Sequence, residues 1–204
     1  GVGRPILPLF GRNGQAMSFD PFANTSGNYN MAVMGTSGSG KSFALNKMAC
    51  ALLGAGVQGF IIDMGRSYKA LCGFVDGQFI EFNKESNLVI NPFELVKDIE
   101  EDRKMLKLVF STMCAPISGV NEYQASVIEK IIETLWEEKK SAATIDDLAA
   151  HLLNYKDHEG RPDPEVNRLG TTMYQFTSHG IYGRWFSGPT NFKFEKELVV
   201  IELD

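Results

Sequence analysis

The chain has 204 residues, of which 44% are hydrophobic and 22% are charged, and its formal net charge is −5. This length and apolar content fit one α/β domain with a sizeable core and room for an inserted subdomain. The acidic balance and the scattered lysines and arginines supply no basic stripe for nucleic acid, and no apolar run approaches the roughly 20 residues that cross a bilayer.

The cysteines and histidines argue against disulfides and zinc. Cys50, Cys72 and Cys114 are odd in number and form no C-x-x-C pair, which favours a reducing intracellular compartment. The three histidines do not fall in metal-ligand spacing with them.

A β-hairpin is the first predicted element. Residues 6–10 and 16–19 flank a spacer that contains Asn13-Gly14, a dipeptide that favours tight hairpin turns. We expect this hairpin to lead into a nucleotide-binding core.

Residues 35–42 fit the phosphate-binding pattern G-x-x-x-x-G-K-[ST]. The apolar residues 31–34 predict a strand before the loop, and a helix from Lys41 to about Leu53, closed by Gly54, is expected after it. Glycines let backbone N–H groups curl around phosphate oxygens, and the helix N-terminus adds partial positive charge. We expect Lys41 to reach the β- and γ-phosphates and Ser42 to hold Mg²⁺, so these two are the catalytic candidates. The expected nucleotide-binding residues are Gly35, Thr36, Ser37, Gly38, Ser39, Gly40, Lys41, Ser42 and Phe43.

Further strands are predicted at 59–63, 78–82, 88–90 and 198–204. Between them, residues 98–176 show helical periodicity in four segments. Thr144 with Asp147 forms a capping-box signature, and Asp163-Pro164 predicts another helix start. The expected fold is therefore α/β, a RecA-like P-loop NTPase with a largely parallel sheet and an inserted all-α subdomain.

The expected division has three parts. Residues 1–95 hold the N-terminal hairpin and the P-loop core, residues 96–180 the helical insertion, and residues 181–204 the return to the core sheet. The chain begins with Gly1 rather than Met and ends in a predicted strand, so we expect a piece of a longer protein, truncated at its C-terminal end.

Nucleotide hydrolysis also needs a second acid near Mg²⁺ and often an arginine. Asp63 ends the strand after the P-loop helix, at the sheet edge where the phosphates are expected. Glu202 and Asp204 follow an apolar run, which is the outline of a Walker B strand or of a plain sheet strand. Arg184 could supply charge to a neighbour's phosphate or stack on Trp185.

Arg66 follows Asp63 closely and could touch phosphate or face water.

Two other P-loop classes fit poorly. Residues 46–49 lack the final aspartate of the base-reading N-K-x-D motif of small GTPases, and the glycine of 63–66 comes one place early for D-x-x-G. Arg161 and Arg168 would be a sparse lid for a small-molecule kinase. The remaining large class is the oligomeric RecA-like motor, whose acid and arginine can lie farther along the chain or in the next subunit.

Five segments in order carry a more specific resemblance. They are MGTSGSGKSF at 34–43, FIIDMGRSYKALC at 60–72, INPF at 90–93, YGRWFSGP at 182–189 and LVVIELD at 198–204. Together they resemble the TraC-type conjugative-transfer ATPases of type IV secretion systems, within the HerA/FtsK group of motors.

This resemblance implies that residues 35–42 bind the phosphates of ATP and Mg²⁺. It places the Walker B Asp-Glu pair beyond the strand at 199–204, which argues against Glu202 as that acid and leaves hydrolysis to the intact protein. It also implies a ring, often a hexamer, at the cytoplasmic face of the bacterial inner membrane, with other secretion components and the coupling protein as partners.

The function expected from these observations is the ATP-binding core of a type IV secretion or conjugation ATPase that powers pilus assembly and substrate transfer. A DNA-translocating motor and a nucleotide-dependent assembly module without turnover stay open as alternatives. Direct contact with nucleic acid is left undecided, and peripheral association with the membrane is compatible with the resemblance.

Overall fold

The computed structural model describes residues 7–11, 13–23, 27–83 and 85–203. Contacts divide the chain into two compact units. Asn87–Lys193 form one, here called the helical unit, and the residues before and after it in the chain form the other, here called the sheet unit. The expected division at 95/96 and 180/181 stays a prediction.

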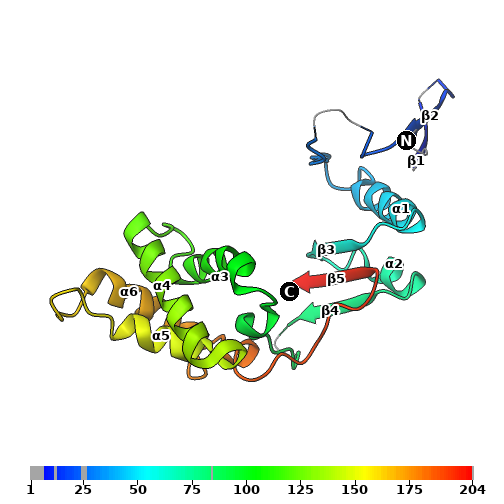
Figure 1. Cartoon of the computed structure of the whole chain (residues 1–204). Helices are drawn as coiled ribbons and strands as arrows, with labels where there is room; N and C mark the ends of the chain where they lie inside the picture. The colour runs from blue at the N-terminus through cyan, green and yellow to red at the C-terminus, as the bar shows by residue number, and fades with distance from the viewer. Residues whose placement is uncertain (1–6, 12, 24–26, 84, 204) are drawn as a thin grey trace. The chain divides into compact units, whose positions relative to one another are not determined.

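A three-stranded parallel sheet is the centre of the sheet unit (Figure 1). Its order is β3 (Gly59–Asp63), β5 (Leu198–Leu203), β4 (Gln78–Phe82), so the last strand of the chain lies between two earlier ones. Parallel neighbours need crossover connections. Helix α2 (Lys69–Phe74) joins β3 to β4, and the whole helical unit lies in the chain between β4 and β5.

The two faces of this sheet differ. On one face, Ile61 and Val200 pack with side chains of α1 (Lys41–Gly54) and α2, among them Leu53 and the buried Leu71. Alternation along β3 turns Phe60 and Ile62 to the opposite face, where 55% and 64% of their surface is exposed. The covered face therefore forms the small core of the sheet unit.

The predicted hairpin is confirmed for the part that the structure describes. β1 (Leu7–Phe10) pairs antiparallel with β2 (Ala16–Phe19), and Gly14 in the turn has φ of +76°. Residue 6, the expected start of the first strand, lies outside the described residues.

The strand expected at 31–34 is wrong. These residues are exposed, and no described strand pairs with them. An apolar run becomes a strand only where a neighbour completes its hydrogen bonds, and sequence periodicity does not report on neighbours.

The strand expected at 88–90 is also wrong. The amide of Val89 binds the Asn191 side chain, and the amide of Ile90 donates to the carbonyl of Trp185, which lies in a turn. The hydrogen bonds of this extended segment therefore go to a loop rather than to a sheet.

Helix α1 runs slightly longer than expected. Gly54 is its last residue, and Gly56, with φ of +84°, takes the left-handed position that follows the helix end. The short helix α2 was not expected, because it has only six residues and carries no side-chain cap.

All four helices expected in residues 98–176 are confirmed. They are α3 (Ile99–Cys114), α4 (Glu122–Lys139), α5 (Ile145–Leu153) and α6 (Pro164–Met173), with 3-10 turns at Pro92–Leu95, Lys140–Ala142, Tyr174–Phe176 and Gly183–Trp185. They enclose one apolar core whose fully buried members include Phe110, Ile132, Leu148 and Val166. This core is separate from that of the sheet unit.

Local capping explains where these helices begin. Asp98 caps α3 and Asn121 forms a capping box with α4. The predicted box of Thr144 with Asp147 starts α5. Asp163 caps α6 by accepting from two backbone amides that follow Pro164, those of Glu165 and Val166.

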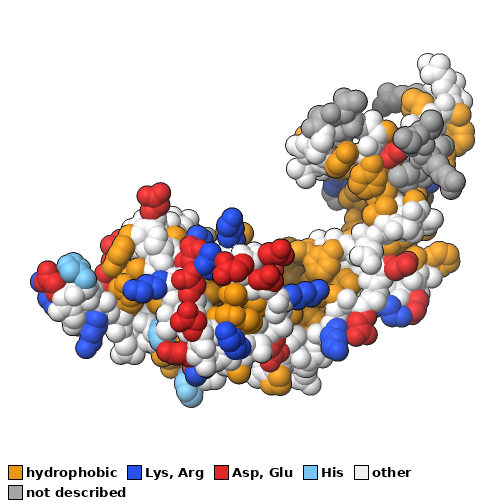
Figure 2. Space-filling view, viewed as in Figure 1, with side chains coloured by type: hydrophobic (Ala, Val, Ile, Leu, Met, Phe, Trp, Pro, Cys, Tyr) orange, Lys and Arg blue, Asp and Glu red, His pale blue; other side chains and the backbone are white. Residues whose placement is uncertain are grey.

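Charges of both signs alternate on the face of the helical unit seen in Figure 2. Between α3 and α4, Glu129 pairs with Lys107 at 2.6 Å and with Arg103 at 3.2 Å.

Candidate nucleotide-binding site

The loop at 35–40 bends as its glycines require. Gly38 and Gly40 have φ of +77° and +86°, a backbone conformation that other residues rarely adopt. A Cβ on Gly35 would come within 2.6 Å of Ser39 Oγ. Gly38 and Gly40 are thus needed for the conformation of the loop itself, and a larger residue at Gly35 would displace the Ser39 side chain.

The start of α1 differs from the starts of the four α-helices of the helical unit. Gly40 occupies its N-cap position and no side chain caps it, whereas side chains cap α3, α4, α5 and α6. The first amides of a helix have no partner within it and carry partial positive charge. This end of α1 therefore presents donors that suit a phosphate group.

Lys41 and Ser42 stand in the first turn of the same helix. The Lys41 ammonium donates to the carbonyl oxygens of Gly35 at 2.7 Å and Thr36 at 3.2 Å, so the side chain folds back over the loop. Ser42 is exposed. One ammonium, one hydroxyl and free helix amides form a donor set that fits a polyphosphate with its metal ion.

Asp63 lies at the C-terminal end of β3, as expected, and its Oδ2 accepts from the amide of Ser67 at 2.7 Å. Directly beside it in the sheet is Glu202, only 1% exposed. Glu202 Oε1 accepts from the amides of Gly65 at 2.7 Å and Arg66 at 2.9 Å. The two carboxylates therefore bind the backbone of the loop at 64–67. Asp204, the other acid considered, lies outside the described residues.

Asn46 joins this loop to helix α1. Its Nδ2 donates to the carbonyl of Ser42 at 2.9 Å and to the carbonyl of Ser67 at 3.1 Å. The residues 46–49 thus lie inside a helix rather than in a loop that could read a base, which agrees with the argument against a small GTPase.

The arginines considered from sequence make contacts with protein groups. Arg66 Nε lies 3.5 Å from Glu81, and the Arg184 guanidinium lies 5.7 Å from the centre of the Trp185 ring. Stacking of Arg184 on Trp185 was one of its two expected environments. Its action on a neighbour's phosphate stays a prediction.

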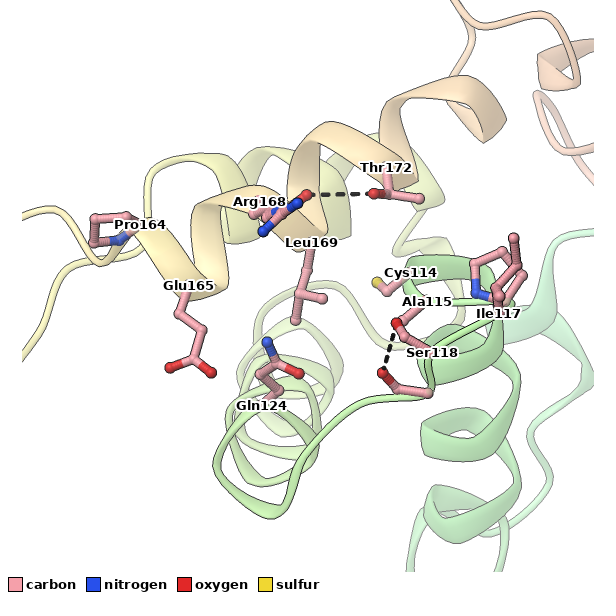
Figure 3. Close-up of a pocket in the computed structure, with 12 residues that line it drawn as sticks. Cys114, Ala115, Ile117, Ser118, Gln124, Pro164, Glu165, Arg168, Leu169 and Thr172 are labelled. Atoms are coloured by element: carbon pink, nitrogen blue, oxygen red, sulfur yellow. Dashed lines mark hydrogen bonds between the residues drawn. The ribbon is translucent and has the colours of Figure 1, made fainter.

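The helical unit contains an open hollow of about 920 Å³ between the end of α3, the start of α4 and α6 (Figure 3). Arg168 and Glu165 of α6 line it, together with Gln124 of α4. Arg161 lies elsewhere, paired with Asp157 and Glu159 of its own turn. The two arginines of the kinase-lid alternative therefore have different surroundings.

Among 7–11, 13–23, 27–83 and 85–203, no helix has the length and apolarity of a membrane span. Within the same part of the chain, no three acidic, histidine or cysteine side chains converge as metal ligands would.

Sequence reasoning missed the roles of Asn46 and Glu202. A hydrophilic side chain one helical turn after Ser42 was the available signal for Asn46. From sequence, Glu202 was considered as a Walker B acid or as the polar end of a plain sheet strand, and its contacts with Gly65 and Arg66 depend on the register between β3 and β5.

Comparisons with known proteins agree with this geometry. A family model described as the TraG P-loop domain matches residues 15–179. Protein TraC of Escherichia coli (strain K12) is 29% identical over 182 residues, which are 86% of this chain and 20% of that protein. The structure of VirB4 of Thermoanaerobacter pseudethanolicus matches with a TM-score of 0.73 and 17% identity, over 99% of this chain and 57% of that chain.

The plasmid coupling protein TrwB, solved with the ATP analogue ADPNP, matches with a TM-score of 0.47 and 14% identity over 82% of this chain and 45% of its own. The chain thus spans about a fifth of TraC and somewhat more than half of the VirB4 chain. The α/β P-loop fold and the resemblance to TraC-type ATPases are confirmed. Because the family model matches most of the chain, the chain belongs to the TraG P-loop domain family.

Proposed function

We propose that this chain is the ATP-binding core of a type IV secretion or conjugation ATPase, which uses Mg²⁺-ATP to power pilus assembly and substrate transfer. The observation that carries the proposal is the start of α1, where no side chain caps the helix and the Lys41 side chain folds back over the glycine loop. Family membership and the likeness to TraC support it.

In this proposal the amides of residues 35–43 bind the α- and β-phosphates, Lys41 neutralises the β- and γ-phosphates, and Ser42 is a ligand of Mg²⁺. Bound magnesium would neutralise charge that develops on the phosphates. Asp63, at the neighbouring strand end, would orient water of the metal shell. Arg184 would act in the next subunit of an assembly.

The partners and location concern the longer protein. We propose a ring, often a hexamer, at the cytoplasmic face of the bacterial inner membrane, in contact with secretion components and the coupling protein. The family motifs in the sequence and the likeness to TraC and VirB4 support this part of the proposal.

The test is nucleotide binding by Lys41→Ala, with Lys47→Ala as its matched control on the exposed face of the same helix. Within the part of the chain that the structure describes, the Lys41 ammonium donates hydrogen bonds only to the loop carbonyls of Gly35 and Thr36. Lys41→Ala should therefore leave the melting temperature nearly unchanged. A lost charge-assisted interaction contributes about 1.5–3 kcal/mol, or roughly 10- to 150-fold in Kd.

Calorimetric titration with Mg²⁺ and a non-hydrolysable ATP analogue measures this effect. Equal affinity in the wild type, Lys41→Ala and Lys47→Ala would refute the site. Hydrolysis is measured in the full-length protein. No turnover there would favour an assembly module, and strong, salt-sensitive stimulation by DNA would favour a DNA motor.

A further inference from the structure

We infer that Glu202 is a positioning residue, which fixes residues 64–67 against the phosphate-binding helix and thereby tunes the affinity for Mg²⁺-nucleotide. This inference rests on the proposed function. It assigns to the central strand β5 a part in the nucleotide site that the P-loop motif does not contain.

The first step is the contact of Glu202 with the loop. Its carboxylate is 1% exposed, and one oxygen accepts from two consecutive amides, those of Gly65 and Arg66. These residues have φ of +117° and +57°. Positive φ at the non-glycine Arg66 is unfavourable by itself, and consecutive amides that converge on one point form a nest for an anion. Glu202 supplies that anion and so holds the loop in this conformation.

The second step leads from the loop to the P-loop helix. Ser67, the next residue, donates its amide to Asp63 Oδ2, and its carbonyl accepts from Asn46 Nδ2. The same Nδ2 donates to the carbonyl of Ser42. Hydrogen bonds on either side of the short backbone segment 65–67 therefore connect buried Glu202, through Asn46, to the backbone of the residue proposed to hold Mg²⁺.

Glu81 provides a matched control. It lies opposite Glu202 in the register of β4 and β5, but its side chain is partly exposed and pairs with the side chains of Arg66 and Lys69 at 3.5 and 3.4 Å. Replacing Glu81 by Gln removes the same charge from the next strand and leaves the loop amides bound. If the loss of a negative charge were all that mattered, Glu81→Gln and Glu202→Gln would change the nucleotide affinity equally.

The experiment compares Glu202→Gln, Glu202→Leu, Asn46→Ala and Glu81→Gln in the full chain. Affinity for Mg²⁺ with a non-hydrolysable ATP analogue is measured by calorimetry. Glu202→Leu should weaken binding about tenfold, because the loop amides lose their acceptor. The affinity of Glu202→Gln should lie between those of Glu202→Leu and the wild type, because a neutral amide oxygen accepts hydrogen bonds from both loop amides but less strongly than a carboxylate does. Glu81→Gln should bind like the wild type.

A double-mutant cycle separates positioning from simple stabilisation of the sheet. If Glu202 acts through Ser67 and Asn46, the effects of Glu202→Leu and Asn46→Ala on affinity are not additive. Additive effects, or wild-type affinity in a folded Glu202→Leu, would overturn the inference. If the Leu variant does not fold, the intermediate affinity of Glu202→Gln decides, and its equality with Glu81→Gln overturns the inference.

Amide hydrogen exchange without nucleotide keeps this inference distinct from the proposed function. Exchange at Gly65 and Arg66 should be slow in the wild type and several-fold faster in Glu202→Gln, with no change in Glu81→Gln. If the wild type binds no nucleotide, the proposed function fails. The role of Glu202 in holding the loop then stands or falls on this exchange measurement.

Discussion

Truncation of Phe110 to alanine should destabilise the helical unit strongly. The side chain is 0% exposed in the core of that unit, and its ring centre lies 5.3 Å from that of Phe93. Removing a buried phenylalanine costs about 3–5 kcal/mol through lost burial and the cavity left behind. Each kcal/mol shifts the melting temperature by roughly 4–8 °C in a domain of about 100 residues, so a fall of roughly 12–40 °C is expected.

Leu108→Ala on the same helix is the matched control, because Leu108 is 68% exposed and a surface change of this kind stays within about 0.5 kcal/mol. Scanning calorimetry and urea unfolding at 25 °C measure both variants. The sheet unit has its own core. At temperatures below the lowered melting temperature, the nucleotide affinity of Phe110→Ala should therefore stay within about twofold of the wild-type value. Similar melting temperatures for the two variants would refute the placement of Phe110 in the core.

Three further results are expected. Gly183→Ala should cost about 1–3 kcal/mol in urea unfolding, because a Cβ there would come within 2.0 Å of the Thr177 carbonyl oxygen, and an unchanged midpoint would contradict this packing. Burial raises the pKa of Asp147, but hydrogen bonds, first among them that from Lys139, outweigh it and lower the pKa below its usual value. The stability that ionised Asp147 contributes is complete above the unfolded pKa of about 4 and is lost as pH falls through the lower folded pKa. In urea titrations, Asp147→Asn should therefore be less stable than the wild type at pH 7 and equally stable in acid. Burial raises the pKa of Cys114 to about 12, so mass spectrometry should find it unmodified by iodoacetamide in the native protein at neutral pH and modified after unfolding; native labelling would contradict its burial.

Features encoded by neighbouring residues could be predicted from the sequence. The P-loop is a run of eight residues whose chemistry resides largely in its own backbone, so its glycines and Lys41 identify it without knowledge of the rest of the fold. The helices of 98–176 were predicted for the same reason. Their caps at Thr144 and Asp163 and their apolar periodicity involve residues only a few positions apart.

Features that depend on distant partners could not be predicted. The apolar residues 31–34 and 88–90 have the composition of strands, but a strand exists only where a neighbour completes its hydrogen bonds. The order of the sheet, with β5 between β3 and β4, likewise depends on pairing between residues more than 100 positions apart.

The sequence by itself determined the motif at 35–42 from which phosphate binding is predicted, because a short backbone motif carries that chemistry. Only the tertiary structure decided what surrounds the loop. Glu202 and Gly65 are 137 positions apart in the chain, and they meet because parallel pairing places Glu202 next to Asp63. A carboxylate at the end of an apolar run looks the same in sequence whether it faces a metal or a pair of backbone amides, since its partner is chosen by the register of the sheet and not by its neighbours in the chain.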